Sequence, residues 1–163
     1  MKARVVLLGV LCLLVGACGQ SGGHVIGIGS NSAPTTGPEG PGYMVQSRTV
    51  PGLGTVLVDG YGLTLYLFVP DHQSGRSTCD SYCATQWPPA TLPKGVTTPV
   101  IGAGIDRALI GTTRRGTVLQ VTYNGWPLYR WIGDTSAGES TGQGIVNSGG
   151  LWYAVNDAGQ PVH

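Results

Sequence analysis

An internal duplication constrains the fold of this chain more than any other feature. The pattern Tyr-x-aromatic-x-x-Asp occurs twice, at Tyr66, Phe68 and Asp71 and again at Tyr129, Trp131 and Asp134. Similar apolar stretches precede both copies, and a tryptophan follows each, at Trp87 and Trp152. Two units of about sixty residues therefore fill residues 43–163, with repeat one at about 43–100 and repeat two at about 101–163.

Each unit has the pattern of short antiparallel strands. In repeat two, residues 117–123 form a β-branched and apolar run, Asn124-Gly125 is a strong hairpin signal, and residues 126–131 return. The 28 glycines and 11 prolines disfavour long helices, and residues 79–86 are the candidate for one or two helical turns. We expect about three strands in each unit and a final strand at residues 151–155. The predicted class is all-β, a small antiparallel sandwich or a partly closed barrel.

Residues 1–17 have the three parts of an export signal, with Lys2 and Arg4 before an apolar run and small residues before a cysteine. The apolar run is shorter than the roughly 20 residues that a membrane-spanning helix needs. The ending Leu14-Val15-Gly16-Ala17-Cys18 resembles the bacterial lipobox. This resemblance implies that Cys18 becomes the first residue of the mature chain and carries a thioether-linked diacylglycerol with acyl chains such as palmitate. An ordinary secretory signal with an accidental cysteine is the alternative.

Residues 18–42 are expected to be the lipidated cysteine followed by a flexible tether rich in Gly, Pro and Ser. The formal net charge of +1 becomes −1 once Lys2 and Arg4 are removed with the signal. No basic region remains to attract nucleic acid or to help hold the membrane, so the acyl chains would anchor the protein alone. The predicted location is the extracytoplasmic face of the cell membrane, with membrane lipid as a partner through Cys18.

The repeated aspartates have three candidate roles. Within each motif, the tyrosine and the aromatic residue two positions on share one face of a strand, and the aspartate lies just past the strand end. There, Asp71 and Asp134 would accept backbone N–H groups of the loops that follow, which is the structural interpretation. Alternatively, the two carboxylates and two tyrosines form a site for a cation or a small polar ligand near a pseudo-symmetry axis. A third interpretation is glycoside hydrolysis, which requires both carboxyls to face one cleft.

Cys79 and Cys83 are the thiols expected in the exported domain, and a disulfide between them is predicted because export places them in an oxidising compartment. The competing interpretation is a metal or redox site that also uses His72 or Asp71. The three intervening residues differ from the usual Cys-x-x-Cys zinc spacing, and no metal site or cofactor is predicted. Trp87, which precedes two prolines, is predicted to fill the core.

Several further segments accompany the two motifs: Cys79-Asp80-Ser81-Tyr82-Cys83-Ala84, Trp87-Pro88-Pro89, Tyr123-Asn124-Gly125-Trp126-Pro127-Leu128-Tyr129, and Gly142-Gln143-Gly144 before Trp152. In combination they resemble the bacterial "secreted repeat of unknown function" lipoproteins, whose signature is this tandem motif. The resemblance covers about residues 55–155. It implies an envelope lipoprotein with a two-repeat β domain, and it brings no established reaction.

Residues 43–163 contain no Gly-x-Ser-x-Gly elbow, no nucleophile with a base at motif spacing and no phosphate-binding loop. We therefore expect a non-enzymatic binding or structural module of the envelope, whose partner would be an envelope protein or a small ligand. The alternative is an extracytoplasmic metal-binding or redox lipoprotein that uses the two cysteines and the tyrosines with His72 and Asp71.

Overall fold

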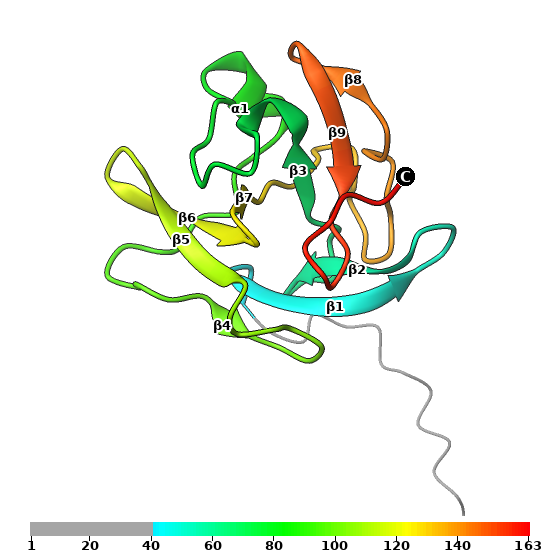
Figure 1. The fold of residues 1–163 in the computed structure, drawn as a ribbon, viewed down its shortest axis with the longest axis horizontal. Helices are drawn as coiled ribbons and strands as arrows, with labels where there is room; N and C mark the ends of the chain where they lie inside the picture. Colours follow the sequence, from blue (N-terminus) through cyan, green and yellow to red (C-terminus); the bar gives the residue numbers. More distant parts are fainter. Residues whose placement is uncertain (1–40) are drawn as a thin grey trace, which may run out of the picture. The chain divides into compact units, whose positions relative to one another are not determined.

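The computed structural model describes residues 41–163 of the chain. The predicted signal, Cys18 and the tether up to residue 40 lie outside the described residues. Eleven short elements follow one another within the described range, most of them strands (Figure 1). In chain order they are β1 (Met44–Val50), β2 (Gly54–Asp59), β3 (Tyr66–Phe68), the 3-10 helix η1 (Val69–Asp71), α1 (Tyr82–Gln86), β4 (Val100–Ile101), β5 (Ile110–Arg115), β6 (Val118–Tyr123), β7 (Trp126–Pro127), β8 (Val146–Asn147) and β9 (Gly150–Ala154).

The strands in this part of the chain form three small sheets, ordered β2-β1-β4, β5-β6-β7 and β3-β9-β8. All neighbouring strands are antiparallel except β1 and β4, which run parallel. The hairpins β1–β2 and β5–β6 are corresponding elements of the two repeats, since each precedes its motif. Three separate sheets confirm the all-β prediction, and they favour its sandwich form over a closed barrel.

The returning strand of repeat two is shorter than predicted. The Asn-Gly turn between β6 and β7 has φ angles of 47° and 79°, as a tight hairpin turn requires. However, β7 ends at Pro127 instead of continuing to Trp131. Tyr129 makes isolated bridges with Tyr66 and with Pro89. The ladder between β6 and β7 does not extend further because Ala90 takes over the pairing: its N–H donates to the carbonyl oxygen of Leu128, and its carbonyl oxygen accepts the N–H of Val121.

The two repeats meet around a local twofold axis. The backbone N–H of Tyr66 donates to the carbonyl oxygen of Tyr129 at 2.9 Å, and the N–H of Tyr129 donates to the carbonyl oxygen of Tyr66 at 3.0 Å. This exchange between equivalent residues places the axis between the two tyrosines. In addition, β3 pairs with β9, so the first motif lies against the last strand of the chain. The motif of repeat one is thereby held by repeat two on both sides.

The buried residues form two hydrophobic clusters. One gathers the aromatic residues of the motifs around the local axis, together with both disulfide cysteines. The other consists mainly of leucine and valine side chains, several of them from β1, β2 and β6. The first cluster is therefore where the repeated residues meet, and the second supports the hairpins.

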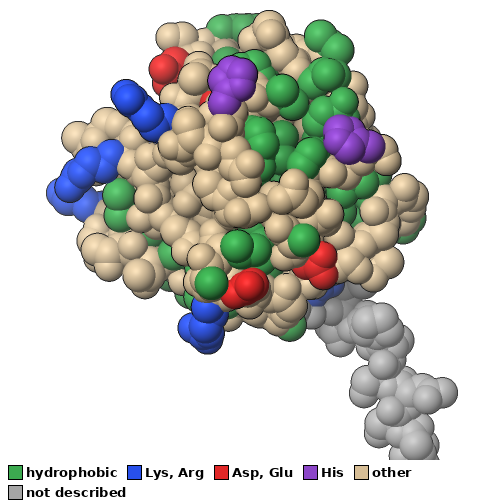
Figure 2. Space-filling view, viewed as in Figure 1, with side chains coloured by type: hydrophobic (Ala, Val, Ile, Leu, Met, Phe, Trp, Pro, Cys, Tyr) green, Lys and Arg blue, Asp and Glu red, His purple; other side chains and the backbone are tan. Residues whose placement is uncertain are grey.

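The surface of the described residues has few charges. On the face drawn in Figure 2, Lys and Arg side chains lie mainly at the end of the domain formed by the β5–β6 hairpin and its neighbouring loops. No helix formed by residues 41–163 is both long and apolar enough to cross a membrane.

Candidate functional site

Each motif tyrosine is hydrogen-bonded to the aspartate of the other repeat. Tyr66 Oη donates to Asp134 Oδ2 at 2.6 Å, and Tyr129 Oη donates to Asp71 Oδ2 at 2.7 Å. The structure therefore brings the four polar motif residues together as two crossed pairs. Sequence reasoning placed these residues near a symmetry axis but missed the exchange.

Each aspartate also closes the loop that follows it. Asp71 Oδ1 accepts the backbone N–H and the side-chain hydroxyl of Thr78, both at 2.7 Å. Asp134 Oδ1 accepts the same two groups of Thr141, at 2.8 and 2.7 Å. These bonds agree with the structural interpretation of the aspartates. The threonines were missed in the sequence, although each lies 7 residues after its aspartate.

All four polar side chains are withdrawn from solvent. The exposed fraction is 0% for Tyr66 and Tyr129, 1% for Asp71 and 5% for Asp134. Burial raises the pKa of both tyrosines, and the neighbouring carboxylates raise it further, so the hydroxyls stay protonated and able to donate. Burial also raises the pKa of the Asp71 carboxyl, and the hydrogen bonds from Thr78 and Tyr129 oppose this rise.

Both carboxylates are therefore already hydrogen-bonded to groups of the protein. Each has one oxygen on a tyrosine and the other on a threonine of its own loop. Glycoside hydrolysis needs carboxyls that reach a substrate in a shared cleft, so we discard that interpretation. Among residues 41–163, no group of three or more His, Cys, Asp or Glu side chains is arranged so that it could hold a metal ion.

The aromatic residues form a paired stack around the same axis. The rings of Trp87 and Trp152 are parallel, with centroids 3.9 Å apart. Tyr66 packs edge-on against Trp87 at 5.4 Å, and Tyr129 packs edge-on against Trp152 at 5.1 Å. Trp87 is fully buried, which confirms its predicted role in the core. The remaining motif aromatics contact the tryptophan of the other repeat, with Phe68 on Trp152 and Trp131 on Trp87.

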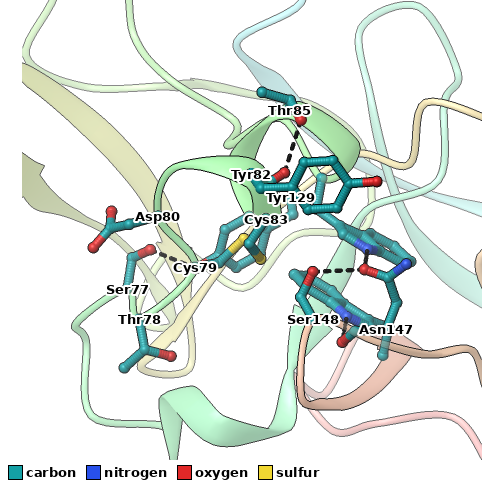
Figure 3. The surroundings of a disulfide bond; sticks show 12 residues. Ser77, Thr78, Cys79, Asp80, Tyr82, Cys83, Thr85, Tyr129, Asn147 and Ser148 are labelled. Atoms are coloured by element: carbon teal, nitrogen blue, oxygen red, sulfur yellow. Dashed lines mark hydrogen bonds between the residues drawn. A yellow bond between two sulfur atoms is a disulfide. The ribbon is translucent and has the colours of Figure 1, made fainter.

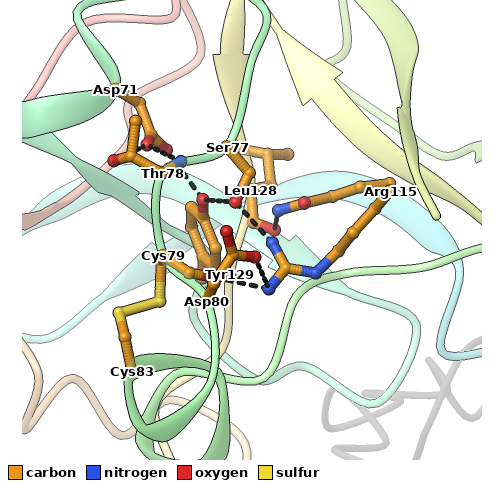
Figure 4. A network of polar contacts seen from close by, with 10 residues as sticks. Asp71, Ser77, Thr78, Cys79, Asp80, Cys83, Arg115, Leu128 and Tyr129 are labelled. Carbon is orange, nitrogen blue, oxygen red and sulfur yellow. Dashed lines mark hydrogen bonds and ion pairs between the residues drawn. A yellow bond between two sulfur atoms is a disulfide. The ribbon is translucent and has the colours of Figure 1, made fainter.

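A cation extends one of the crossed pairs. Arg115, at the end of β5, donates hydrogen bonds to Ser77 Oγ and to the carbonyl oxygen of Cys79, and it forms an ion pair with Asp80 at 3.0 Å (Figure 4). Ser77 Oγ lies 2.7 Å from Tyr129 Oη. Arg115 can only donate, and the tyrosine gives its proton to a carboxylate, so Ser77 must donate to the tyrosine oxygen. A directed chain of hydrogen bonds thus links β5 of repeat two to the loop of repeat one.

A disulfide lies beside this network. Cys79 and Cys83 are bonded to each other, with Cα atoms 5.2 Å apart, and tie the start of α1 to the preceding loop (Figure 3). Both cysteines are buried. The bond engages the two sulfur atoms that the metal or redox interpretation would use, while His72 lies exposed on its loop.

Both motifs fall within segments that match a known family. A family profile described as "secreted repeat of unknown function" matches residues 48–91 and 110–156, which together exceed half of the chain. The chain belongs to this family. The two matched segments correspond to the two structural repeats, and membership in a secreted-repeat family implies an extracellular or envelope location. No match was found among curated proteins or among solved structures.

Proposed function

We propose that this secreted-repeat protein is a lipid-anchored module of the bacterial envelope that acts by binding and not by catalysis. The observation that carries the proposal is the burial of the crossed pairs, Tyr66 with Asp134 and Tyr129 with Asp71. The residues that recur in both repeats stabilise the domain. Other molecules would therefore be bound by surface residues outside the two motifs.

The anchor is assigned to Cys18. The segment from Leu14 to Cys18 resembles a lipobox, and the Gly-, Pro- and Ser-rich residues 19–42 would separate the lipid from the domain. A flexible linker of this length spans very roughly 25 Å. Two acyl chains give stable anchoring, because each buried methylene contributes about 0.8 kcal/mol.

The anchor is tested with the full chain expressed in a bacterium that processes lipoproteins. We expect wild-type protein in the membrane fraction, and a mature N-terminus at Cys18 with the mass of a diacylglyceryl group. Cys18→Ala should release the protein from the membrane. The matched control Cys12→Ala removes a cysteine within the signal and should leave membrane association unchanged. Membrane association of Cys18→Ala, or an unmodified Cys18, would contradict the assignment.

Thiol titration and elemental analysis of the purified chain test the binding role against the metal or redox alternative. We expect Cys79 and Cys83 to resist thiol reagents until a reductant is added, and metal to stay below stoichiometric amounts. Two reactive thiols together with one bound metal ion per chain would instead support the alternative function.

A further inference from the structure

Two neighbouring depressions on the described domain share Pro93 as a common wall. The larger has a volume of about 510 Å³ and is open to solvent; its walls include Tyr43, Tyr61 and Arg130. The smaller has a volume of about 200 Å³, and Lys94 and Arg114 contribute to its lining. The loop that follows Thr91 separates them and contributes to both. The two depressions therefore adjoin at Pro93.

The larger depression offers an aromatic and apolar lining. Tyr61 is 53% exposed, so one part of its ring is available to a ligand. Leu63 and Pro93 add apolar surface beside it. The guanidinium of Arg130 is fixed by an ion pair with Asp59 at 2.6 Å and by a hydrogen bond to the carbonyl oxygen of Gly42. Arg130 thus holds the wall of the depression, and its charge is neutralised by its partner.

The smaller depression is positively charged. Neither Lys94 nor Arg114 forms an ion pair with an acidic side chain among residues 41–163. Of the residues that the structure describes, no Asp or Glu lines either depression. Both cations line this depression together with Thr117 and Val118 of the β5–β6 hairpin. Within a screening length of about 8 to 10 Å, this site attracts anions.

We propose that this surface binds an anionic glycan, that is, a sugar chain bearing carboxylate or phosphate groups. Sugar rings present flat C–H faces that pack against an aromatic ring such as Tyr61, and their acidic substituents would pair with Lys94 and Arg114. An apolar depression beside unpaired cations matches both parts of such a ligand. The inference rests on the proposed binding function and names its ligand class.

The test measures binding of the purified full chain to three probes by calorimetry. These are hexagalacturonate, a phosphorylated mannan oligosaccharide and neutral maltohexaose. We expect at least one acidic probe to bind about tenfold more tightly than maltohexaose, which corresponds to about 1.4 kcal/mol. Equal affinity for all three probes, or no binding of either acidic probe, would overturn the proposal.

A double variant and a matched control test the charged part of the site. The double variant Lys94→Ala/Arg114→Ala should weaken binding of the acidic probe about tenfold or more. The control Arg76→Ala/Arg107→Ala removes the same charge from two exposed cations that do not line the depressions, and should change affinity less than about twofold. Equal losses in both double variants would indicate diffuse attraction and overturn the site.

The aromatic part is tested separately. Tyr61→Ala should also weaken binding, whereas Tyr82→Ala, which removes a tyrosine that is 71% exposed and lies outside both depressions, should not. Binding to vesicles of anionic lipid through Lys94 and Arg114, without glycan binding, would overturn the proposal in favour of a membrane contact. The Cys18→Ala variant should keep glycan affinity, so a failure of the anchor and a failure of this site are distinguishable.

Discussion

The two crossed pairs use the same hydrogen-bonding unit but are supported in different ways. Beside Asp71, the loop is tied by a disulfide, and Ser77 and Arg115 extend the chain of hydrogen bonds to Tyr129. Beside Asp134, Tyr66 Oη instead accepts the backbone N–H of Gly142 at 3.3 Å. The pair at Asp71 is thus supported by a disulfide and by a cation. The pair at Asp134 is supported by a backbone N–H that lies close to the tyrosine oxygen.

Gly142 explains why repeat two has no disulfide at the position equivalent to Cys79. It lies eight residues after its aspartate, as the first disulfide cysteine does in repeat one. A Cβ atom at Gly142 would lie 2.9 Å from the Tyr66 ring and 3.0 Å from Trp87. No cysteine fits there without displacing the aromatic core. The comparison teaches that the duplicated unit fixes the core hydrogen bonds, while each repeat supplies its own support.

Removing the shared tryptophan stack should break both copies at once. Trp87→Ala deletes a fully buried ring that contacts Tyr66, Trp131 and Trp152. We expect the free energy of unfolding to fall by about 3 to 5 kcal/mol. Urea denaturation measures the loss, and hydrogen exchange should accelerate in both repeats. Acceleration confined to repeat one would show that the two copies are independent.

Alkaline pH should destabilise the folded domain through the tyrosine hydroxyl of each crossed pair. The pKa of Tyr66 and Tyr129 is raised in the folded protein, so the unfolded chain loses these protons first, near pH 10. The two protonated tyrosines contribute fully to the free energy of unfolding below about pH 10. Above that pH this contribution falls, by up to about 1.4 kcal/mol per pH unit for each tyrosine. Urea denaturation between pH 8 and 11 measures this. Tyr66→Phe and Tyr129→Phe should each reduce this slope, because each removes one of the two hydroxyls with a raised pKa.

Single hydroxyl deletions should distinguish the two pairs. Tyr129→Phe leaves an oxygen of Asp71 and the hydroxyl proton of Ser77 without a partner, whereas Tyr66→Phe leaves an oxygen of Asp134 and the N–H of Gly142 without one. We expect losses of about 3 and about 2 kcal/mol respectively, within the range for buried unpaired polar groups. The larger loss is expected for Tyr129→Phe because its bond with Ser77, at 2.7 Å, is shorter than the 3.3 Å bond from Gly142. Equal losses in chemical denaturation, or a larger loss for Tyr66→Phe, would contradict the role given to Ser77.

Opening the disulfide should affect one copy only. Cys79→Ala/Cys83→Ala removes a short cross-link, which on the chain-entropy estimate costs about 2 kcal/mol of stability. Hydrogen exchange should increase in residues 74–86 and stay unchanged in the loop after Asp134. An equal increase in both loops would show that the disulfide supports the whole domain and not its own copy.

Much of the fold could be predicted because it depends on local rules. The run at residues 117–123 became β6 (Val118–Tyr123), and the expected final strand at 151–155 became β9 (Gly150–Ala154). The Asn-Gly pair between β6 and β7 made the expected tight turn because both residues tolerate positive φ. The returning strand is shorter because the segment around Ala90 pairs with both Leu128 and Val121, and the position of that segment depends on tertiary structure.

The candidate site was predictable only in part. Loop closure by Asp71 and Asp134 follows from the chemistry of a carboxylate before a turn, and the structure contains both closures. The exchange of tyrosines was not predictable, because the sequence spacing is identical whether a tyrosine meets its own aspartate or the other one. Arg115 was also missed, since the loop it contacts lies more than thirty residues earlier in the chain.

The crossed pairs have a consequence for any shorter form of the protein. A fragment with one repeat would contain one motif tyrosine and one motif aspartate, and both would lack their hydrogen-bond partners, which belong to the other repeat. Such a fragment would not be self-sufficient. It could satisfy both groups only by associating with an identical fragment as a symmetric homodimer, in which the covalent connection between the repeats is replaced by mass action.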